Sequence, residues 1–237
     1  MRKLEFQNGE YYHILNRGVD KRVIFDDEKD YIRFLRSMRE FNVSKQIGGI
    51  YNVRKMNSGE QSEASAQSLN LSNEVLNNAD IKDSSLLEAS DCLVEIIAYS
   101  LLPNHFHLIL KQSTEHGISK FMQKISMGYA NYYNLKNRRS GRLFQGKFKS
   151  IHINEDGYFL WVSGYINGNP EIHKIVKAEV WPWSSYMDYL GLRKGTLPDK
   201  NVIMKEFKDI NEYREFTEMI IRESRQKKVD IKQYCLE

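Results

Sequence analysis

Two apolar runs joined by a tight turn constrain the fold of this chain more than any other feature. The first run covers residues 92–102, the second begins at residue 105, and Pro103-Asn104 lies between them. Pro and Asn are frequent turn residues, and strands joined this tightly pair in an antiparallel hairpin. The pattern therefore predicts an antiparallel sheet, and we expect the second run to be one of its inner strands.

The second run carries two histidines, His105 and His107. Residues i and i+2 of a strand project from the same face, so both imidazoles point one way while Phe106 points the other. Histidine is the commonest metal ligand, and a strand holds two of them side by side. For an isolated pair, one structural histidine with an accidental neighbour is the alternative interpretation.

The rest of the chain adds one strand and several helices. An aromatic and aliphatic run at residues 11–18 predicts a first strand. His13 lies on it, as a structural histidine or, if a neighbouring strand brings it close, as a third ligand. Apolar side chains at intervals of three and four residues predict helices over residues 26–42, 117–137, 154–166 and 201–225. Asn154 is the expected N-cap of the third helix.

Residues 57–91 differ sharply in composition from their surroundings. They contain eight serines, no aromatic residue and no proline, and seven acids against one lysine give a net charge of −6. Such a tract buries little apolar surface, so we expect a flexible acidic insertion. Because the core pattern resumes after it, we predict one domain over residues 1–190, followed by a helical extension and polar tail at 191–237.

The composition is that of an ordinary globular protein, with 41 % hydrophobic and 28 % charged residues. Two cysteines far apart in the sequence predict no disulfide framework and fit a reducing compartment. Neither a signal peptide nor a run long enough to span a bilayer is visible, so we expect a cytoplasmic protein without a membrane partner.

The net charge of +4 conceals a strongly basic block. Residues 116–154 contain eight Lys and Arg and no Asp or Glu, which predicts a polyanion-binding surface, with nucleic acid as the first candidate. Interleaved aromatic side chains favour that interpretation over a solvated face whose acidic partners come from elsewhere in the fold. The residues expected to contact DNA are Arg17, Lys136, Arg138, Arg139, Arg142, Lys147 and Lys149.

Five segments resemble, in order, the motifs of one family. They are Tyr12–Gly18, Leu102–Leu108, Gly141–Ser150, Tyr165–Pro170 and Trp181–Tyr186. These segments resemble the opening strand, the HUH motif (histidine, hydrophobic residue, histidine), the basic loop, the YIxxNP tyrosine motif and the WPWSSY segment of the single-tyrosine HUH transposases. The REP-associated tyrosine transposases are the most similar branch. Residues 45–91 have no counterpart in the family, and residues 190–237 match only loosely.

The resemblance implies an α+β fold of the ferredoxin-like (RRM-like) type. It is an antiparallel sheet with helices packed on one face and the HUH motif on a central strand. The implied activity is site-specific cleavage and joining of single-stranded DNA near hairpins. By position, His105 and His107 are metal ligands, Tyr165 is the nucleophile and Asn169 is a third ligand. The implied partner is hairpin-containing single-stranded DNA, and the protein is a monomer or a homodimer.

The implied chemistry is physically reasonable. A divalent cation neutralises the scissile phosphate, and a tyrosine hydroxyl, with a pKa of about 10 when free, attacks to form a phosphotyrosine. The leaving 3′-hydroxyl can later reverse the step, so no ATP is required. Mg²⁺ or Mn²⁺ is the expected metal, and an imidazole-rich site favours Mn²⁺.

The assignment of the nucleophile leaves rivals. Tyr158 lies on the same predicted helix face as Tyr165. The spacing of Tyr129, Tyr132 and Tyr133 fits an apolar stripe of core or DNA-stacking residues.

Two other functions compete with the transposase. One is a non-cleaving module that binds hairpin DNA or RNA, which would bind with steep salt dependence. The other is a metal-dependent hydrolase without covalent catalysis, which needs further ligands. His116, His152 and His173 are available for that role but lack ligand spacing to a partner.

Overall fold

The computed structural model describes residues 5–44 and 92–226, and the expected insertion at 57–91 lies outside the described residues. Its strands are β1 (Tyr11–Arg17), β2 (Val94–Leu102), β3 (His105–Gln112) and β4 (Lys149–Ile153). Its α-helices are α1 (Glu28–Glu40), α4 (Gly117–Lys136), α5 (Asp156–Ile172), α6 (Tyr186–Tyr189), α7 (Asn201–Met204) and α8 (Ile210–Gln226). Two short 3₁₀ turns, η1 (Val19–Lys21) and η4 (Ala178–Val180), also lie in the described residues.

The four strands form one antiparallel sheet in the order β2-β3-β1-β4. β2 and β3 pair as the predicted hairpin, with Leu102 opposite His105 and a register shift between Ile96 and Ala98. β3 is an inner strand because β1 pairs with its other side. The α+β fold class predicted from the sequence is therefore confirmed.

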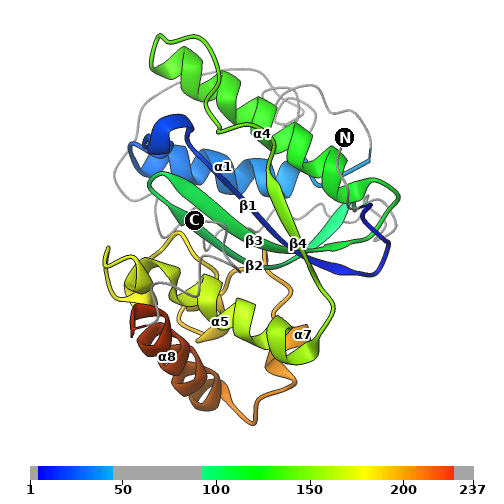
Figure 1. Cartoon of the computed structure of the whole chain (residues 1–237), viewed down its shortest axis with the longest axis vertical. Coiled ribbons are helices and arrows are strands. Elements are labelled where there is room, and N and C mark those ends of the chain that lie inside the picture. Colours follow the sequence, from blue (N-terminus) through cyan, green and yellow to red (C-terminus); the bar gives the residue numbers. More distant parts are fainter. Residues whose placement is uncertain (1–4, 45–91, 227–237) are drawn as a thin grey trace, which may run out of the picture.

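The expectation that the helices pack on one face of the sheet is wrong. α1 and α4 cover one face, and α5 covers the other, with α8 packed against α5 (Figure 1). The alternation along β3 explains the second layer. Phe106 and Leu108 belong to the α1/α4 core, while Ile109, on the same face as His107, belongs to the α5/α8 core. A sheet with apolar side chains on both faces needs cover on both.

The first helical layer begins at a well-formed cap. Asp27 accepts a hydrogen bond from the Asp30 backbone N–H and Asp30 reciprocates, which makes a capping box. Asp30 is fully buried. Its Oδ1 forms an ion pair with Lys136 Nζ, at the end of α4, at a distance of 2.7 Å. The start of α1 is thereby joined to the end of α4.

The second layer differs from the prediction at the start and end of α5. Glu155, not Asn154, is the N-cap, because β4 runs to Ile153 and the following residues only connect the two elements. The helix then continues past residue 166, through Pro170, to Ile172. Tyr165 and Asn169 therefore lie on one continuous helix.

α8 lies close against α5 where α5 carries glycines. A Cβ added at Gly164 would lie 2.7 Å from Ile220, and one added at Gly168 would lie 2.6 Å from Ile221. A side chain at either position would have to displace an isoleucine of α8, so the two glycines favour this close approach of the helices. The predicted terminal helical region at 201–225 is thus two helices, of which the longer one supports α5.

The WPWSSY segment, Trp181–Tyr186, is hydrogen-bonded to β2 at the edge of the sheet. The Trp181 indole donates to the Leu101 carbonyl, and Ser185 bonds with the Tyr99 backbone. A buried ion pair between Arg193 and Asp188 lies beside this segment. No helix in the described part of the chain is long and apolar enough to cross a membrane.

Candidate active site

His105 and His107 lie on β3 and face α5. His105 is partly exposed at the start of the strand, and His107 is fully buried. Their ring centroids are 5.2 Å apart. His105 Nδ1 lies 2.6 Å from Asn104 Oδ1, and because an amide oxygen only accepts, this nitrogen carries the proton. The lone pair of that ring is therefore on Nε2.

Tyr165 lies against the histidine pair. Its ring centroid is 6.1 Å from that of His107, with the ring planes at 81°. Trp161, one turn earlier on α5, stacks on the Tyr165 ring, with the ring centroids 5.2 Å apart and the ring planes at 11°. Tyr165 is only 1 % exposed. Of the tyrosines predicted as possible nucleophiles, this is the one that the structure brings to the histidines.

Two buried asparagines on α5 have opposite surroundings. Asn167 donates to the Tyr213 hydroxyl at 2.8 Å and accepts from Ser185 at 2.7 Å. Asn169 is also 0 % exposed, yet neither of its amide atoms has a hydrogen-bond partner among the described residues. An unpaired buried amide costs about 1–3 kcal/mol, a cost that the paired amide of Asn167 avoids.

The position of Asn169 follows from its helical neighbours. Tyr165, Asn169 and His173 follow one another at intervals of four residues, so they share one side of the helix. Tyr165 contacts the ring of His107, and the His173 ring centroid is 5.0 Å from that of His105. Asn169 lies between these two contacts and therefore faces the pair.

Sequence reasoning missed the neighbourhood of His173, and left that of His13 open. Both histidines border the pair: His13 Nε2 is 2.9 Å from His107 Nδ1, and His173 contacts His105. The signal for His173 was its distance of eight residues from Tyr165, which is about two helical turns. Among the described residues, no group of three or more His, Cys, Asp and Glu side chains is placed to hold a metal ion.

Two of the predicted DNA-binding residues share the sheet face of the histidines. Arg17 pairs with His105 across β1 and β3, and Leu15 pairs with both His107 and Lys149. Directly opposed residues project from the same face, so Arg17 and Lys149 stand beside the histidines. Arg17 also donates through Nε to the Gln145 side chain and accepts from the Gln145 backbone. The basic loop is thereby anchored next to the site.

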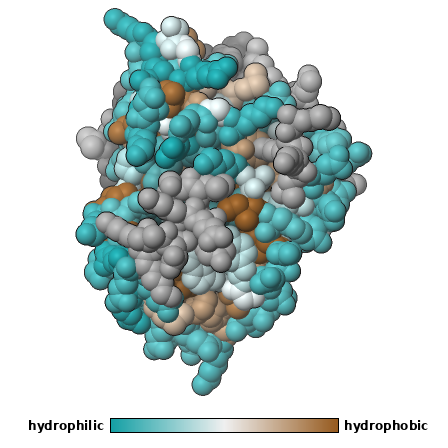
Figure 2. Space-filling model, viewed as in Figure 1, coloured by the Kyte–Doolittle hydropathy of each residue, from teal (hydrophilic) through white to brown (hydrophobic). Residues whose placement is uncertain are grey.

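Lys136 occupies a different environment from the other predicted contacts. Its ammonium binds Asp30 at 2.7 Å and Asp27 at 3.0 Å. Burial alone would lower its pKa, but the hydrogen bonds to these carboxylates raise the pKa above the usual value. For this residue, the acidic partners do come from elsewhere in the fold. Arg138, Arg142 and Lys147 are exposed and Arg139 is partly exposed, in the segment that follows α4. The surface around the end of α4 is largely hydrophilic in Figure 2.

The tyrosines of α4 lie on the opposite face of the sheet. Tyr129 and Tyr133 donate to the backbone carbonyls of Ile24 and Val23. Tyr132 donates to Asp30, and burial followed by this bond raises its pKa to about 12. All three hydroxyls hold structural hydrogen bonds, away from the histidine pair.

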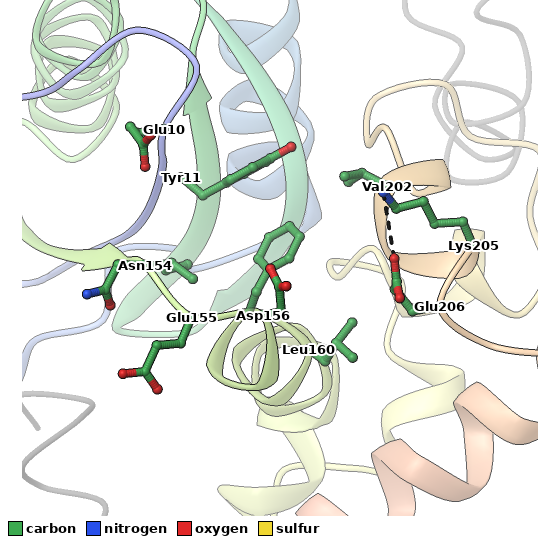
Figure 3. A pocket seen from close by; sticks show the side chains of 11 residues that line it. Glu10, Tyr11, Asn154, Glu155, Asp156, Leu160, Val202, Lys205 and Glu206 are labelled. Atoms are coloured by element: carbon green, nitrogen blue, oxygen red, sulfur yellow. Dashed lines mark ion pairs between the residues drawn. The ribbon is translucent and has the colours of Figure 1, made fainter.

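A pocket of about 320 Å³ lies at the other end of α5 (Figure 3). Its lining is mainly acidic and aromatic: Glu10, Glu155, Asp156 and Glu206 lie around Tyr11 and Phe159, with Lys205 3.6 Å from Glu206. Acidic walls repel a phosphate backbone. This pocket is therefore unsuited to DNA, and the candidate site is the histidine face further along the helix.

The geometry agrees with a comparison of the sequence with protein families. Residues 78–169 match the family model described as "Transposase IS200 like". The matched segment contains His105, His107, Tyr165 and Asn169, whereas β1 lies outside it. The resemblance to single-tyrosine transposases that the motifs predicted is confirmed by this match.

Among curated proteins, none matches the sequence. One solved structure, described as a REP-associated tyrosine transposase bound to a REP hairpin, aligns with a TM-score of 0.49 and 15 % identity, over 81 % of this chain and 85 % of that one. This similarity is too low to transfer the ligand of that protein to this chain.

Proposed function

We propose that this protein cleaves and rejoins single-stranded DNA near hairpins through a covalent bond to Tyr165. His105, His107 and Asn169 would hold a divalent metal at the scissile phosphate. One observation carries the proposal: the Tyr165 ring lies against His107 within the same chain, in a segment that matches a transposase family. A core tyrosine needs no histidine pair beside it.

The residues present suit the proposed metal. Two imidazoles and one amide oxygen make a neutral donor set of the kind that binds Mn²⁺ and, less tightly, Mg²⁺. The amide of Asn169 is buried without a hydrogen-bond partner among the described residues, so its oxygen could serve as a metal ligand without breaking a hydrogen bond. When bound, the metal supplies positive charge that polarises the phosphate and reduces its repulsion of the nucleophile.

The covalent steps of the proposed reaction take place at Tyr165. Tyr165 Oη attacks phosphorus and loses its proton, while the bond from phosphorus to the 3′-oxygen of the preceding nucleotide breaks. That oxygen takes up a proton and leaves as a 3′-hydroxyl, and the strand downstream stays on the protein as a 5′-phosphotyrosine. Attack by a 3′-hydroxyl from another strand reverses the step and frees Tyr165. No external energy source is required.

Charge near the histidines would guide the strand. Arg17 and Lys149 project from the same sheet face, and both can neutralise flanking phosphates. Since Tyr165 is 1 % exposed, entry of the strand has to move the side chains around it. Trp161, stacked on Tyr165 and only partly buried, is the side chain that a nucleobase would meet there.

A covalent-capture assay tests the proposal. A single-stranded hairpin library labelled at the 3′ end is incubated with the protein and Mn²⁺, and labelled protein is resolved under denaturing conditions. We expect an adduct with the wild type, none with Tyr165→Phe, and a normal yield with Tyr158→Phe, the matched control on the same helix. Hairpin binding by the wild type without any adduct would instead assign a non-cleaving binding module.

The proposal also states that the histidine pair and the nucleophilic tyrosine of one active site come from the same chain. An equimolar mixture of His107→Ala and Tyr165→Phe proteins tests this point, since each variant lacks a different half of the site. We expect the mixture to stay inactive. Recovery of the adduct would show that tyrosine is delivered from a second chain.

A further inference from the structure

His13 is a buried histidine that the proposed reaction does not use. It lies on β1 with 1 % exposure, opposite Ile109 and diagonal to His107 on the same sheet face. Its Nε2 is 2.9 Å from His107 Nδ1, and the two ring planes are 26° apart. A direct hydrogen bond therefore joins the buried imidazoles.

We propose that His13 is a positioning residue that holds His107 in the tautomer and orientation needed for metal binding. This inference rests on the proposed function. A ring that coordinates through Nε2 carries its proton on Nδ1, and that proton needs an acceptor. In this fold the acceptor is His13 Nε2. Such partners of metal-ligating histidines fix the ring and raise its basicity.

The other histidine of the pair has an equivalent partner. His105 Nδ1 donates to Asn104 Oδ1, from the turn that precedes the strand. Both histidines thus have Nδ1 engaged by the protein, which makes Nε2 the ligand atom in each. The partner of His105 is adjacent in sequence, whereas His13 is 94 residues from His107.

A role of His13 as a third metal ligand fits less well. Its Nε2 already meets His107 Nδ1, so the same nitrogen cannot also bind an ion that His107 holds. In addition, no cluster of three or more His, Cys, Asp and Glu side chains in residues 5–44 and 92–226 is arranged to hold a metal. The contact with His107 Nδ1 therefore favours a role in which His13 holds a metal ligand in place and does not bind the metal itself.

Two substitutions that differ by one methylene test the proposal. In His13→Gln, the amide oxygen can reach the position of Nε2 and accept from His107 Nδ1–H. In His13→Asn, the amide is too short to do so. Mn²⁺ affinity of each full-length variant is measured by electron paramagnetic resonance of free and bound Mn²⁺, without DNA, and thermal unfolding confirms that each variant is folded.

We expect His13→Asn to bind Mn²⁺ roughly 10–100-fold more weakly than the wild type, and His13→Gln to stay within about threefold. Equal affinity of both variants and the wild type would overturn the proposal, and so would an equal loss in both. His107→Ala serves as the reference. If His107→Ala binds Mn²⁺ as tightly as the wild type, the proposed metal site is wrong. If only His107→Ala loses Mn²⁺ affinity, the metal site stands and the role of His13 is wrong.

Discussion

The helices α4 and α5 carry tyrosines on opposite faces of the same sheet, and the two groups have different surroundings. On α4, the hydroxyls of Tyr129, Tyr132 and Tyr133 are bonded to backbone carbonyls or to Asp30. On α5, Tyr165 lies beside His107 and one turn before a buried amide that has no hydrogen-bond partner in the described part of the chain. Satisfied polar groups hold a fold together, whereas unsatisfied ones beside potential ligands mark a place for chemistry.

The largest expected difference between the two faces concerns the covalent adduct. Because Tyr165 is the proposed nucleophile, Tyr165→Phe should lower adduct formation roughly 10³-fold or more. Tyr129→Phe, Tyr132→Phe and Tyr133→Phe, each alone, should stay within about threefold per folded molecule, since they are remote from the site. Gel quantification of the labelled adduct measures both. A tenfold or greater loss of adduct in a folded α4 variant would contradict the distinction between the tyrosines of α4 and Tyr165.

The two buried asparagines of α5 sharpen the comparison within one helix. Asn167→Leu removes partners of Tyr213 and Ser185, so it should destabilise the protein by about 2–4 kcal/mol. Asn169→Leu removes an unsatisfied amide, so stability should change by less than about 1 kcal/mol or rise, while Mn²⁺ affinity falls at least roughly tenfold. Urea unfolding and Mn²⁺ titration provide the two measurements. Severe destabilisation by Asn169→Leu would identify Asn169 as a structural residue.

The basic residues divide in a similar way. Lys149 shares the face of the histidines, whereas Lys136 is paired with Asp27 and Asp30. Lys149→Met should reduce the slope of log affinity for single-stranded DNA against log salt concentration by about 1, and Lys136→Met should leave it unchanged. Binding measured by fluorescence anisotropy over a range of salt concentrations tests both. An equal reduction by the two variants would place Lys136 in the DNA contact after all.

A smaller effect is expected at high pH on the α4 face. Burial raises the pKa of Tyr132 and Tyr133 to about 12 in the folded protein, with further contributions from Asp30 and Asp26. A raised pKa means that the neutral phenol is favoured by folding. Stability is then complete below the unfolded value of about 10 and is lost as the pH rises toward 12.

Unfolding followed between pH 9 and 12 checks this prediction. In Tyr132→Phe the decline should be shallower than in the wild type, by up to about one linked proton. A decline of the same slope in both proteins would show that Tyr132 does not contribute.

Local sequence patterns predict much of this fold. The hairpin around Pro103-Asn104 and the helical stripe of α4 depend on neighbours in sequence, and both were predicted within a few residues. β4 was missed because its residues 149–153 have little apolar character and gain their partner, β1, from a distant part of the chain. The second helical layer was missed for the same reason, since burial of a sheet on both faces is a tertiary property.

The candidate site divides along the same line. The histidine pair and the spacing from Tyr165 to Asn169 are local, so the sequence indicated them. The bond from His13 to His107 joins two strands, and the capture of Lys136 by Asp30 joins two helices. Register between strands and docking of helices decide such contacts, and periodicity along one segment does not contain them.

The most direct test of the account is to locate the DNA on the protein. Tryptic digestion of the purified adduct separates the tyrosines of α4, on the peptide 125–136, from those of α5, on the peptide 150–174. Fragmentation in the mass spectrometer then distinguishes Tyr158 from Tyr165. We predict a nucleotide phosphate on Tyr165. A nucleotide on Tyr158, or on any tyrosine of the α4 peptide, would contradict the assignment of the histidine face as the active site.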